Sequence, residues 1–263
     1  MDPFILKLVL SFVVGSLWIT GATVVAEKAG TKLGGFIAGL PSTIVVGLLF
    51  IGVVNGAVAA GEATDAMGLL VGIGCVMLVV FSWLVSRGFW LALAIYFSIW
   101  LVAALGSFVY DFHYFWAGCV VFLVLFFPSL YLLEKALKIS SEEGRKIDYT
   151  RLQIFGRIVL SGSMITFAVY LSKVGGPLLG GIFSVFPAVI LSTLIIAYLA
   201  HGVEFTRSIS KALILSSPSL VLYAILVRWS YPEFGLFFGT AISYVVSVAF
   251  GWPCYQFMKK YLK

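Results

Sequence analysis

Long apolar runs recur along the chain and are separated by short polar or turn-forming segments. About 20 apolar residues in a row are enough for a helix to cross the hydrocarbon core of a bilayer. The pattern therefore predicts an all-α polytopic membrane protein with about nine transmembrane helices. The expected spans are 4–26, 33–56, 66–86, 88–110, 113–133, 152–173, 177–201, 209–228 and 234–257.

One unusual phrase occurs twice, as LGGFIAGLP at Leu33–Pro41 and as LGGIFSVFP at Leu179–Pro187. The two copies belong to a longer match, in which Leu33–Gly56 and Leu179–Gly202 are identical at 7 of 24 positions without gaps. Shorter matches extend this pairing in both directions, so that spans 1–4 resemble spans 6–9. The Gly and Pro identities carry the most weight because each reflects a backbone requirement. We therefore expect an internal duplication.

The fifth predicted span decides how the two halves are oriented. Each half has an even number of helices, so a direct fusion would place both the same way up in the membrane. The extra helix turns the second half over, which predicts two inverted-topology four-helix repeats, as in many secondary transporters. The expected organisation is a first repeat at 1–110, a linking helix and cytoplasmic basic loop at 111–151, and a second repeat at 152–263.

Composition and charge support a bilayer environment. The chain is 62% hydrophobic and 11% charged, whereas a soluble domain carries about 25% charged residues. Soluble enzymes and soluble binding modules are thereby excluded. With nine spans, 3 of the 17 Lys and Arg residues (Lys7, Lys173 and Arg228) lie on one side and 14 on the other. The positive-inside rule then predicts an outer N-terminus and a cytoplasmic C-terminus in a plasma or inner membrane, and it explains the net charge of +6 without nucleic acid.

Proline and glycine within spans 2 and 7 suggest a binding site. A Pro inside a helix frees a backbone carbonyl that needs another partner in lipid, and broken helices frame the substrate sites of many transporters. The alternative is an ordinary kink with small-residue packing. Span 8 adds three hydroxyls, for which bonding back to their own helix is the alternative. The candidate substrate-binding residues are Pro41, Ser42, Thr43, Ser184, Pro187, Ser216, Ser217 and Ser219, and glycines allowing close backbone approach are Gly34, Gly35, Gly39, Gly180 and Gly181.

Two pairs of polar residues occupy matching places in the repeats. Asn55 and His201 each precede a Gly at a helix end, where a proton-linked role competes with interfacial capping. Lys7 and Arg157 could attract an anion, and snorkelling to the headgroups is the alternative.

The same search predicts no catalytic residues, no metal site, no cofactor and therefore no enzyme. The chain has two His residues, three scattered Cys residues and no phosphate-binding glycine loop. The expected partners are membrane lipid and a small solute, with no nucleic acid, and a homodimer is left open.

The stretch Leu171–Gly202, together with its looser copy at Gly34–Thr43, resembles the GlpM-type small bacterial membrane proteins, which have about four spans. Each half would correspond to one such unit, although Leu40 stands where the second half has Phe186. That family implies no biochemical function. Inverted four-helix units are also similar in architecture to the drug/metabolite transporter group and to fluoride channels.

These patterns together favour a secondary transporter of a small neutral, lipid-like or anionic solute. Alternating access would come from rocking one inverted repeat against the other. Two alternatives share the same scaffold, namely a passive ion or solute channel and a non-transporting membrane accessory subunit.

Overall fold

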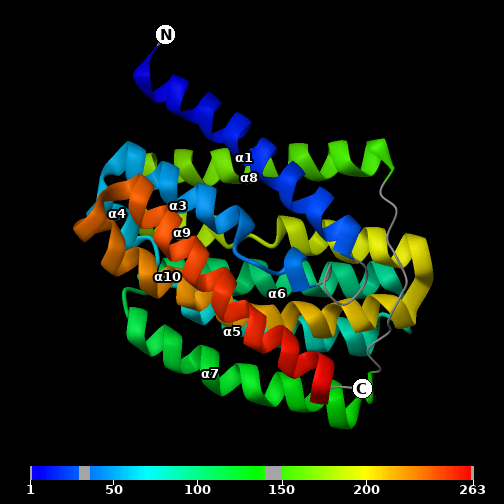
Figure 1. Cartoon of the computed structure of the whole chain (residues 1–263). Coiled ribbons are helices and arrows are strands. Elements are labelled where there is room, and N and C mark those ends of the chain that lie inside the picture. Colours follow the sequence, from blue (N-terminus) through cyan, green and yellow to red (C-terminus); the bar gives the residue numbers. More distant parts are fainter. Residues whose placement is uncertain (1, 30–35, 140–149, 262–263) are drawn as a thin grey trace.

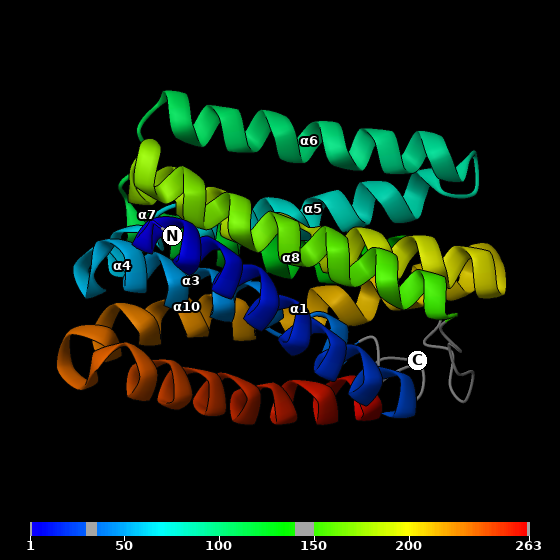
Figure 2. The same ribbon diagram turned by 90° about the horizontal axis from the view of Figure 1, so that it is seen from above.

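The protein is a bundle of long helices, described here from a computed structural model (Figure 1). The structure describes residues 2–29, 36–139 and 150–261. Within these ranges no strand occurs, and seven helices are long and apolar enough to cross a membrane. The all-α class expected from the sequence is therefore confirmed, and the long apolar helices are consistent with a multi-pass membrane protein. The N-terminus and the C-terminus lie toward opposite ends of the bundle (Figures 1 and 2).

The helices cover the predicted apolar runs, but the last two predicted spans and part of the seventh lie within one long element. Turns of only a few residues join several of the consecutive helices. The elements are α1 (Pro3–Ala29), α3 (Ser42–Asn55), α4 (Ala57–Glu62), α5 (Met67–Leu84), α6 (Phe89–Val109), α7 (Phe115–Tyr131), the π-helical η1 (Leu132–Ala136), α8 (Arg151–Val174), α9 (Pro177–Ser184) and α10 (Ala188–Tyr261).

Two helices are interrupted at the repeated phrase. A helical stretch at 36–38 ends before Pro41, and α3 starts immediately after that proline. In the same way α9 ends at Ser184 and α10 starts immediately after Pro187. Each proline stands just before the new helix, where its missing N–H costs no helical hydrogen bond. The repeated sequence thus produces the same local break twice.

Glycines with positive φ mark further changes of direction. The backbone of α10 leaves helical geometry at Gly202, with φ 78°, and at Gly235, with φ 74°. Gly56 between α3 and α4 has φ 96° and occupies the position that aligns with Gly202 in the repeat. Only glycine adopts this region without a Cβ penalty. A single element of 74 residues therefore contains three segments of different direction.

Helices far apart in the sequence pack closely. α1 lies along α8 (Figure 1), where Ser11 Oγ donates to Thr166 Oγ1 at 3.3 Å. α5 lies against α7, and a Cβ on Gly68 would approach the Gly118 carbonyl carbon to 2.6 Å. Small residues allow such backbone contact between helices in a membrane. α6 lies at one edge of the bundle beside α5 (Figure 2).

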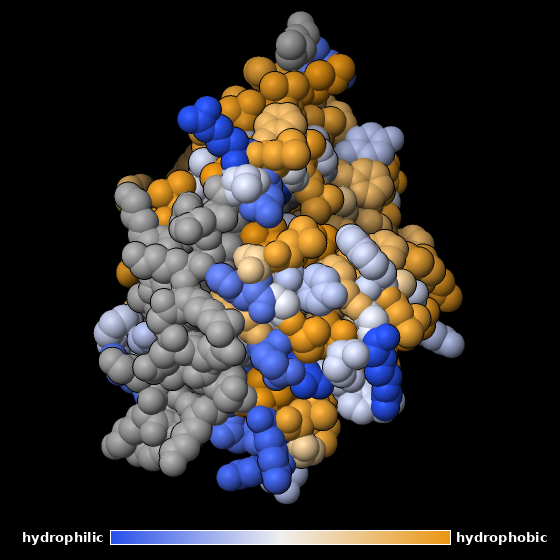
Figure 3. Space-filling model, turned by 90° about the vertical axis from the view of Figure 1, so that its right-hand side faces the viewer, coloured by the Kyte–Doolittle hydropathy of each residue, from blue (hydrophilic) through white to orange (hydrophobic). Residues whose placement is uncertain are grey.

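The outer surface is largely apolar, as a lipid-facing surface should be. Large hydrophobic side chains such as Trp90, Val102 and Phe238 are more than half exposed. In the view of Figure 3, hydrophilic side chains gather in the middle of this end of the bundle, and an apolar surface lies above and to the right of them. This distribution fits helices that cross a bilayer and end in polar surroundings.

Candidate functional site

A pocket opens at the place where the two interrupted helices meet. It is lined by both breaks and by segments of α5, α6 and α10, and the empty space is about 700 Å³ including its open side. Its lining residues are Ala38, Gly39, Leu40, Ser42, Thr43, Ile44, Leu70, Val71, Gly74, Cys75, Met77, Leu78, Tyr96, Trp100, Val185, Phe186, Pro187, Val189, Ile190, Leu213, Ser217 and Leu220.

The predicted substrate-binding residues divide into two groups. Ser42, Thr43, Pro187 and Ser217 line the pocket, and so does Gly39 from the glycine set. Gly39 belongs to the first copy of the phrase and Pro187 to the second copy, which starts 146 residues further along, so the structure brings the two copies together. The remaining residues, Pro41, Ser184, Ser216 and Ser219, are not among the lining residues.

Four of the predicted hydroxyls bond to their own helix, including that of Ser217, which lines the pocket and donates to the Ile214 carbonyl at 2.7 Å. Ser184 donates to the Gly180 carbonyl at 2.9 Å, and Ser216 donates to the Leu213 carbonyl at 2.8 Å. Ser219 donates to the Ser216 carbonyl at 2.6 Å. Such local bonds satisfy a hydroxyl in an apolar helix. These hydroxyls therefore agree with the alternative considered from the sequence, in which they bond back to their own helix.

The glycines serve helix packing. A Cβ on Gly180 would collide with Ser172 of α8, and one on Gly181 would collide with the Ala63 carbonyl after α4. A Cβ on Gly39 would collide with the Ser216 side chain. Gly34 and Gly35 lie outside the described residues. Close approach of helix backbones, the role that small residues have in membrane bundles, explains the described positions.

Of the two matched polar pairs, Lys7 and Asn55 bond to neighbouring helices. Lys7 Nζ donates to the Val53 carbonyl near the end of α3 at 2.8 Å, and Asn55 Nδ2 donates to Ser172 Oγ at 2.9 Å. His201 packs its ring against Phe205 at 4.5 Å between centroids. Arg157 is 3% exposed. None of these four residues is among those that line the pocket.

Aromatic residues of α6 complete the pocket in a way that the sequence analysis missed. Tyr96 is fully buried and Trp100 is 4% exposed. Within the part of the chain that the structure describes, neither Tyr96 Oη nor Trp100 Nε1 has a hydrogen-bond partner. Cys75 Sγ, on α5, lies 3.3 Å from Ser217 Oγ on α10. The pocket thus combines an apolar lining with several polar atoms.

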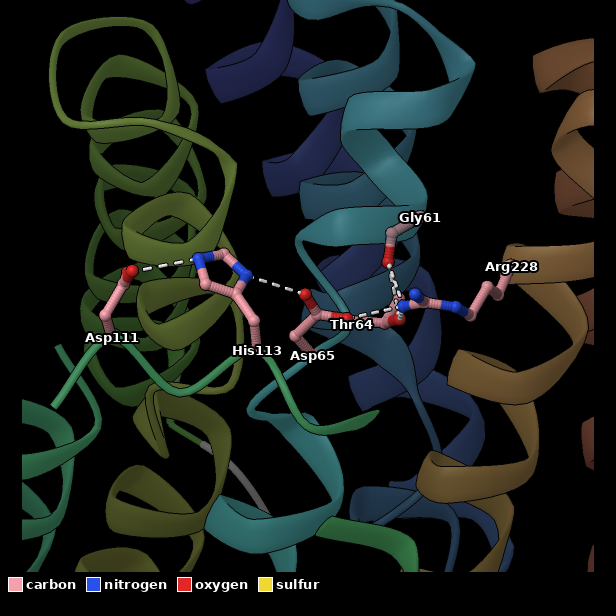
Figure 4. Close-up of polar contacts among 6 residues, drawn as sticks. All are labelled: Gly61, Thr64, Asp65, Asp111, His113 and Arg228. Carbon is pink, nitrogen blue, oxygen red and sulfur yellow. Dashed lines mark hydrogen bonds and ion pairs between the residues drawn. The ribbon is translucent and has the colours of Figure 1, made fainter. Parts of the chain in front are cut away.

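A cluster of charged residues joins the helices at one end of the bundle (Figure 4). The Asp65 side chain is 4% exposed and lies between Arg228 of α10 and His113 of the loop before α7. Arg228 Nη1 donates to Asp65 Oδ1 at 2.5 Å and to the Gly61 carbonyl at 3.1 Å. The guanidinium also lies 4.8 Å from the centre of the Phe115 ring. The buried carboxylate is therefore paired with a cation, as a buried charge requires.

His113 extends this cluster toward the surface. Its Nδ1 lies 2.8 Å from Asp65 Oδ2, and its Nε2 lies 3.1 Å from Asp111 Oδ1 (Figure 4). The hydrogen bond with Asp65 raises the pKa of His113 above its ordinary value, while partial burial acts in the opposite direction. Of the two carboxylates that His113 contacts, the buried Asp65 is therefore the closer partner.

A second ion pair joins α10 to η1. Lys211 of α10 is 1% exposed, pairs with Glu134 of η1, and donates to the Ile139 carbonyl at 3.0 Å. One turn earlier, Arg207 Nε donates to the Ser82 carbonyl at 2.8 Å. Residues 207–211 of α10 therefore lie beside 82 and 134–139, whereas Arg228 lies beside the turn before α5. Among the described residues, no group of three or more His, Cys, Asp or Glu side chains could hold a metal ion.

Comparison with known proteins gives one match. Residues 8–113 are similar to a family described as "Protein of unknown function (DUF3147)". No curated protein and no solved structure matches the chain. The resemblances to GlpM-type proteins and to the drug/metabolite transporter group thus stay predictions. The matched region comprises 106 of 263 residues, from α1 to the loop before α7.

Proposed function

We propose that the protein is a secondary membrane transporter whose substrate site is the pocket between the two interrupted helices. The observation that carries this proposal is the convergence of both copies of one sequence phrase on a single pocket. Interrupted helices that meet near a pseudo-two-fold axis frame the substrate in many transporters with inverted repeats. Ser42, Thr43, Pro187 and Ser217 belong to this site.

Nine membrane crossings account for the contacts at the two ends of the bundle. Asp65, His113 and Arg228 meet at one end. A second group of contacts, the Arg207–Ser82 hydrogen bond and the Lys211–Glu134 ion pair, lies in another part of the bundle. With nine crossings, the first group lies outside and the second group lies in the cytoplasm. Under this proposal, the long element α10 contains three crossings that are separated at Gly202 and Gly235.

The inverted repeat is supported by local geometry that recurs at aligned positions. Helices start directly after Pro41 and Pro187, and glycines with positive φ stand at 56 and 202. The family match also ends at residue 113, close to the predicted end of the first repeat at residue 110. We therefore propose that 1–110 and 152–263 are duplicated units linked by 111–151, and that they rock against each other during transport.

The charged cluster would close one end of the transport path. α5 and α10 both line the pocket, and the Asp65–Arg228 pair joins the turn before α5 to α10. Release of that pair would let the two helices separate at that end. Alternating access requires two such arrangements with similar free energies.

Exchange flux in proteoliposomes tests the proposal. A panel of radiolabelled anionic, neutral and cationic small amphipaths is loaded, and saturable exchange is measured for the wild type and for Gly74→Leu. Gly74 lines the pocket, and a Cβ there would meet no atom within 4 Å, so leucine is chosen to narrow the pocket from this position. Gly106→Leu is the matched control, because it also has open space but lies outside the pocket.

The expected result is saturable exchange that Gly74→Leu abolishes and Gly106→Leu retains. Flux that rises linearly with concentration would favour the channel alternative. Absence of flux for the whole panel would contradict transport and favour the accessory-subunit alternative.

A further inference from the structure

Two hydrogen-bond donors on one face of α6 line the pocket without a partner. Tyr96 and Trp100 are four residues apart, so their side chains lie on the same face of the helix. Tyr96 Oη and Trp100 Nε1 are both buried and unpaired in the described part of the chain. An indole N–H can only donate. Because unsatisfied buried polar atoms are costly, a ligand that accepts hydrogen bonds would complete this wall.

Two helix N-termini add further donors on the other walls. α3 starts at Ser42, and no side chain caps its first turn. α10 starts at Ala188, and its first-turn residues Val189 and Ile190 line the pocket with Thr43. The first N–H groups of a helix have no partner within it, and they carry a partial positive charge. Negative charge is therefore favoured where these two helices begin.

The other lining residues limit the charge and the shape of a ligand. None of them is Asp, Glu, Lys, Arg or His. A cation would find no carboxylate, and a doubly charged anion would find no side-chain cation to offset the loss of its hydration. Most of the remaining lining side chains are apolar, among them Leu70, Met77 and Phe186.

We infer that the pocket binds amphipathic monoanions, with a carboxylate held by the donors of α6 and by the two helix N-termini, and with an apolar body among the aliphatic and aromatic side chains. This inference rests on the proposed function, because it names the substrate class of the same site. It narrows the expected substrates from neutral, lipid-like and anionic solutes to amphipathic monoanions.

Ligand binding to the purified protein in nanodiscs tests this inference. The probes are benzoate, its neutral counterpart benzamide and the cation benzylammonium, which share one ring and differ in the head group. Binding is measured from the rise in melting temperature with ligand concentration. We expect saturable binding of benzoate, weaker binding of benzamide and no binding of benzylammonium.

Variants with matched controls locate the carboxylate. Tyr96→Phe removes one donor and should weaken benzoate binding by roughly tenfold or more, the usual effect of losing a hydrogen bond to a charged group. Tyr223→Phe is the control, because Tyr223 is also a fully buried tyrosine but does not line the pocket. Unchanged benzoate affinity in Tyr96→Phe would overturn the inference.

The outcomes separate the inference from the proposed function. If benzylammonium or benzamide binds more tightly than benzoate, and Gly74→Leu abolishes that binding, the site is kept and the anionic class is overturned. If no probe binds, the anionic class is overturned, and the proteoliposome exchange with the wider panel decides the proposed function independently.

Discussion

Asp65→Asn should destabilise the protein measurably, because the carboxylate is the centre of the charged cluster. The substitution keeps the shape of the side chain and removes its charge. Asp65 accepts from Arg228 at 2.5 Å and lies 2.8 Å from His113, with 4% of its side chain exposed. One hydrogen bond to a charged group contributes about 1.5–3 kcal/mol, and breaking a fully buried ion pair costs about 3–5 kcal/mol.

Solvent reduces the expected effect. The Arg228 side chain is 39% exposed and keeps its bond to the Gly61 carbonyl, so its charge is not left unsolvated. We therefore expect a loss of about 2 kcal/mol in the free energy of unfolding at pH 7, at the lower end of these ranges. At roughly 2–4 °C per kcal/mol for a chain of this size, the melting temperature should fall by about 4–8 °C.

The assay is thermal unfolding in detergent, followed by tryptophan fluorescence. Asp111→Asn is the matched control, because the Asp111 side chain is 80% exposed and also contacts His113. Such an exposed pair contributes about 0–1 kcal/mol. A double-mutant cycle with Arg228→Gln then isolates the pairwise energy. Equal melting temperatures for Asp65→Asn and Asp111→Asn, with no coupling in the cycle, would refute the reasoning.

Three further predictions concern pH, the helix breaks and close packing. The pKa of His113 is raised in the folded protein, so its protonated form stabilises the fold. This contribution is fully present below about pH 6.5, the ordinary pKa of His. It is lost as pH rises through the higher pKa of the folded state. The melting temperature of the wild type should therefore fall relative to His113→Gln across that window, and parallel curves would contradict this. Pro41→Ala should reduce transport more than Pro128→Ala in α7, whereas equal losses would argue against a role for the break. Gly181→Ala should lower stability by about 1–3 kcal/mol through overpacking against a backbone carbonyl. Gly106→Ala, which meets open space, should not lower stability on the same melting assay.

The apolar pattern and the repeated phrase predict much of the fold. Runs of apolar residues locate the long helices because a bilayer requires each helix to satisfy its own backbone. Pro41 and Pro187 mark the interruptions because each stands in the repeated glycine-containing phrase, whereas Pro128 alone leaves α7 helical. These features depend on local backbone chemistry, which is readable from a single sequence.

The composition of the pocket could not be predicted in the same way. Tyr96 and Trp100 stand in a span that is apolar all round, so no periodicity separates a pocket-facing side from a lipid-facing side. Ser216 and Ser217 are adjacent and chemically alike, yet only Ser217 lines the pocket. Which of the two faces the cavity depends on the rotation of α10 against its neighbours, and that rotation is set by tertiary packing.

The sequence contains a pattern from which the charged cluster could have been predicted. Asp65 and Arg228 are 163 residues apart, but both stand at span ends that the nine-span topology places on the outer side. That side carries only three basic residues by the same topology, so Arg228 and the acidic residues at the outer span ends were candidates for a pair. The role of His113 as a bridge depends on the loop conformation, which the sequence does not specify.

The central claim is that the pocket opens alternately to the two sides of the membrane, and the native Cys75 reports this without any knowledge of the substrate. Cys75 lines the pocket and is 1% exposed. In a Cys119→Ser/Cys254→Ser background, a membrane-impermeant maleimide is applied to right-side-out and to inside-out vesicles. Alternating access predicts slow modification from each side, with a ligand that favours one state accelerating one orientation and slowing the other. Equal and rapid modification from both sides, or complete protection in both orientations under all conditions, would contradict the account.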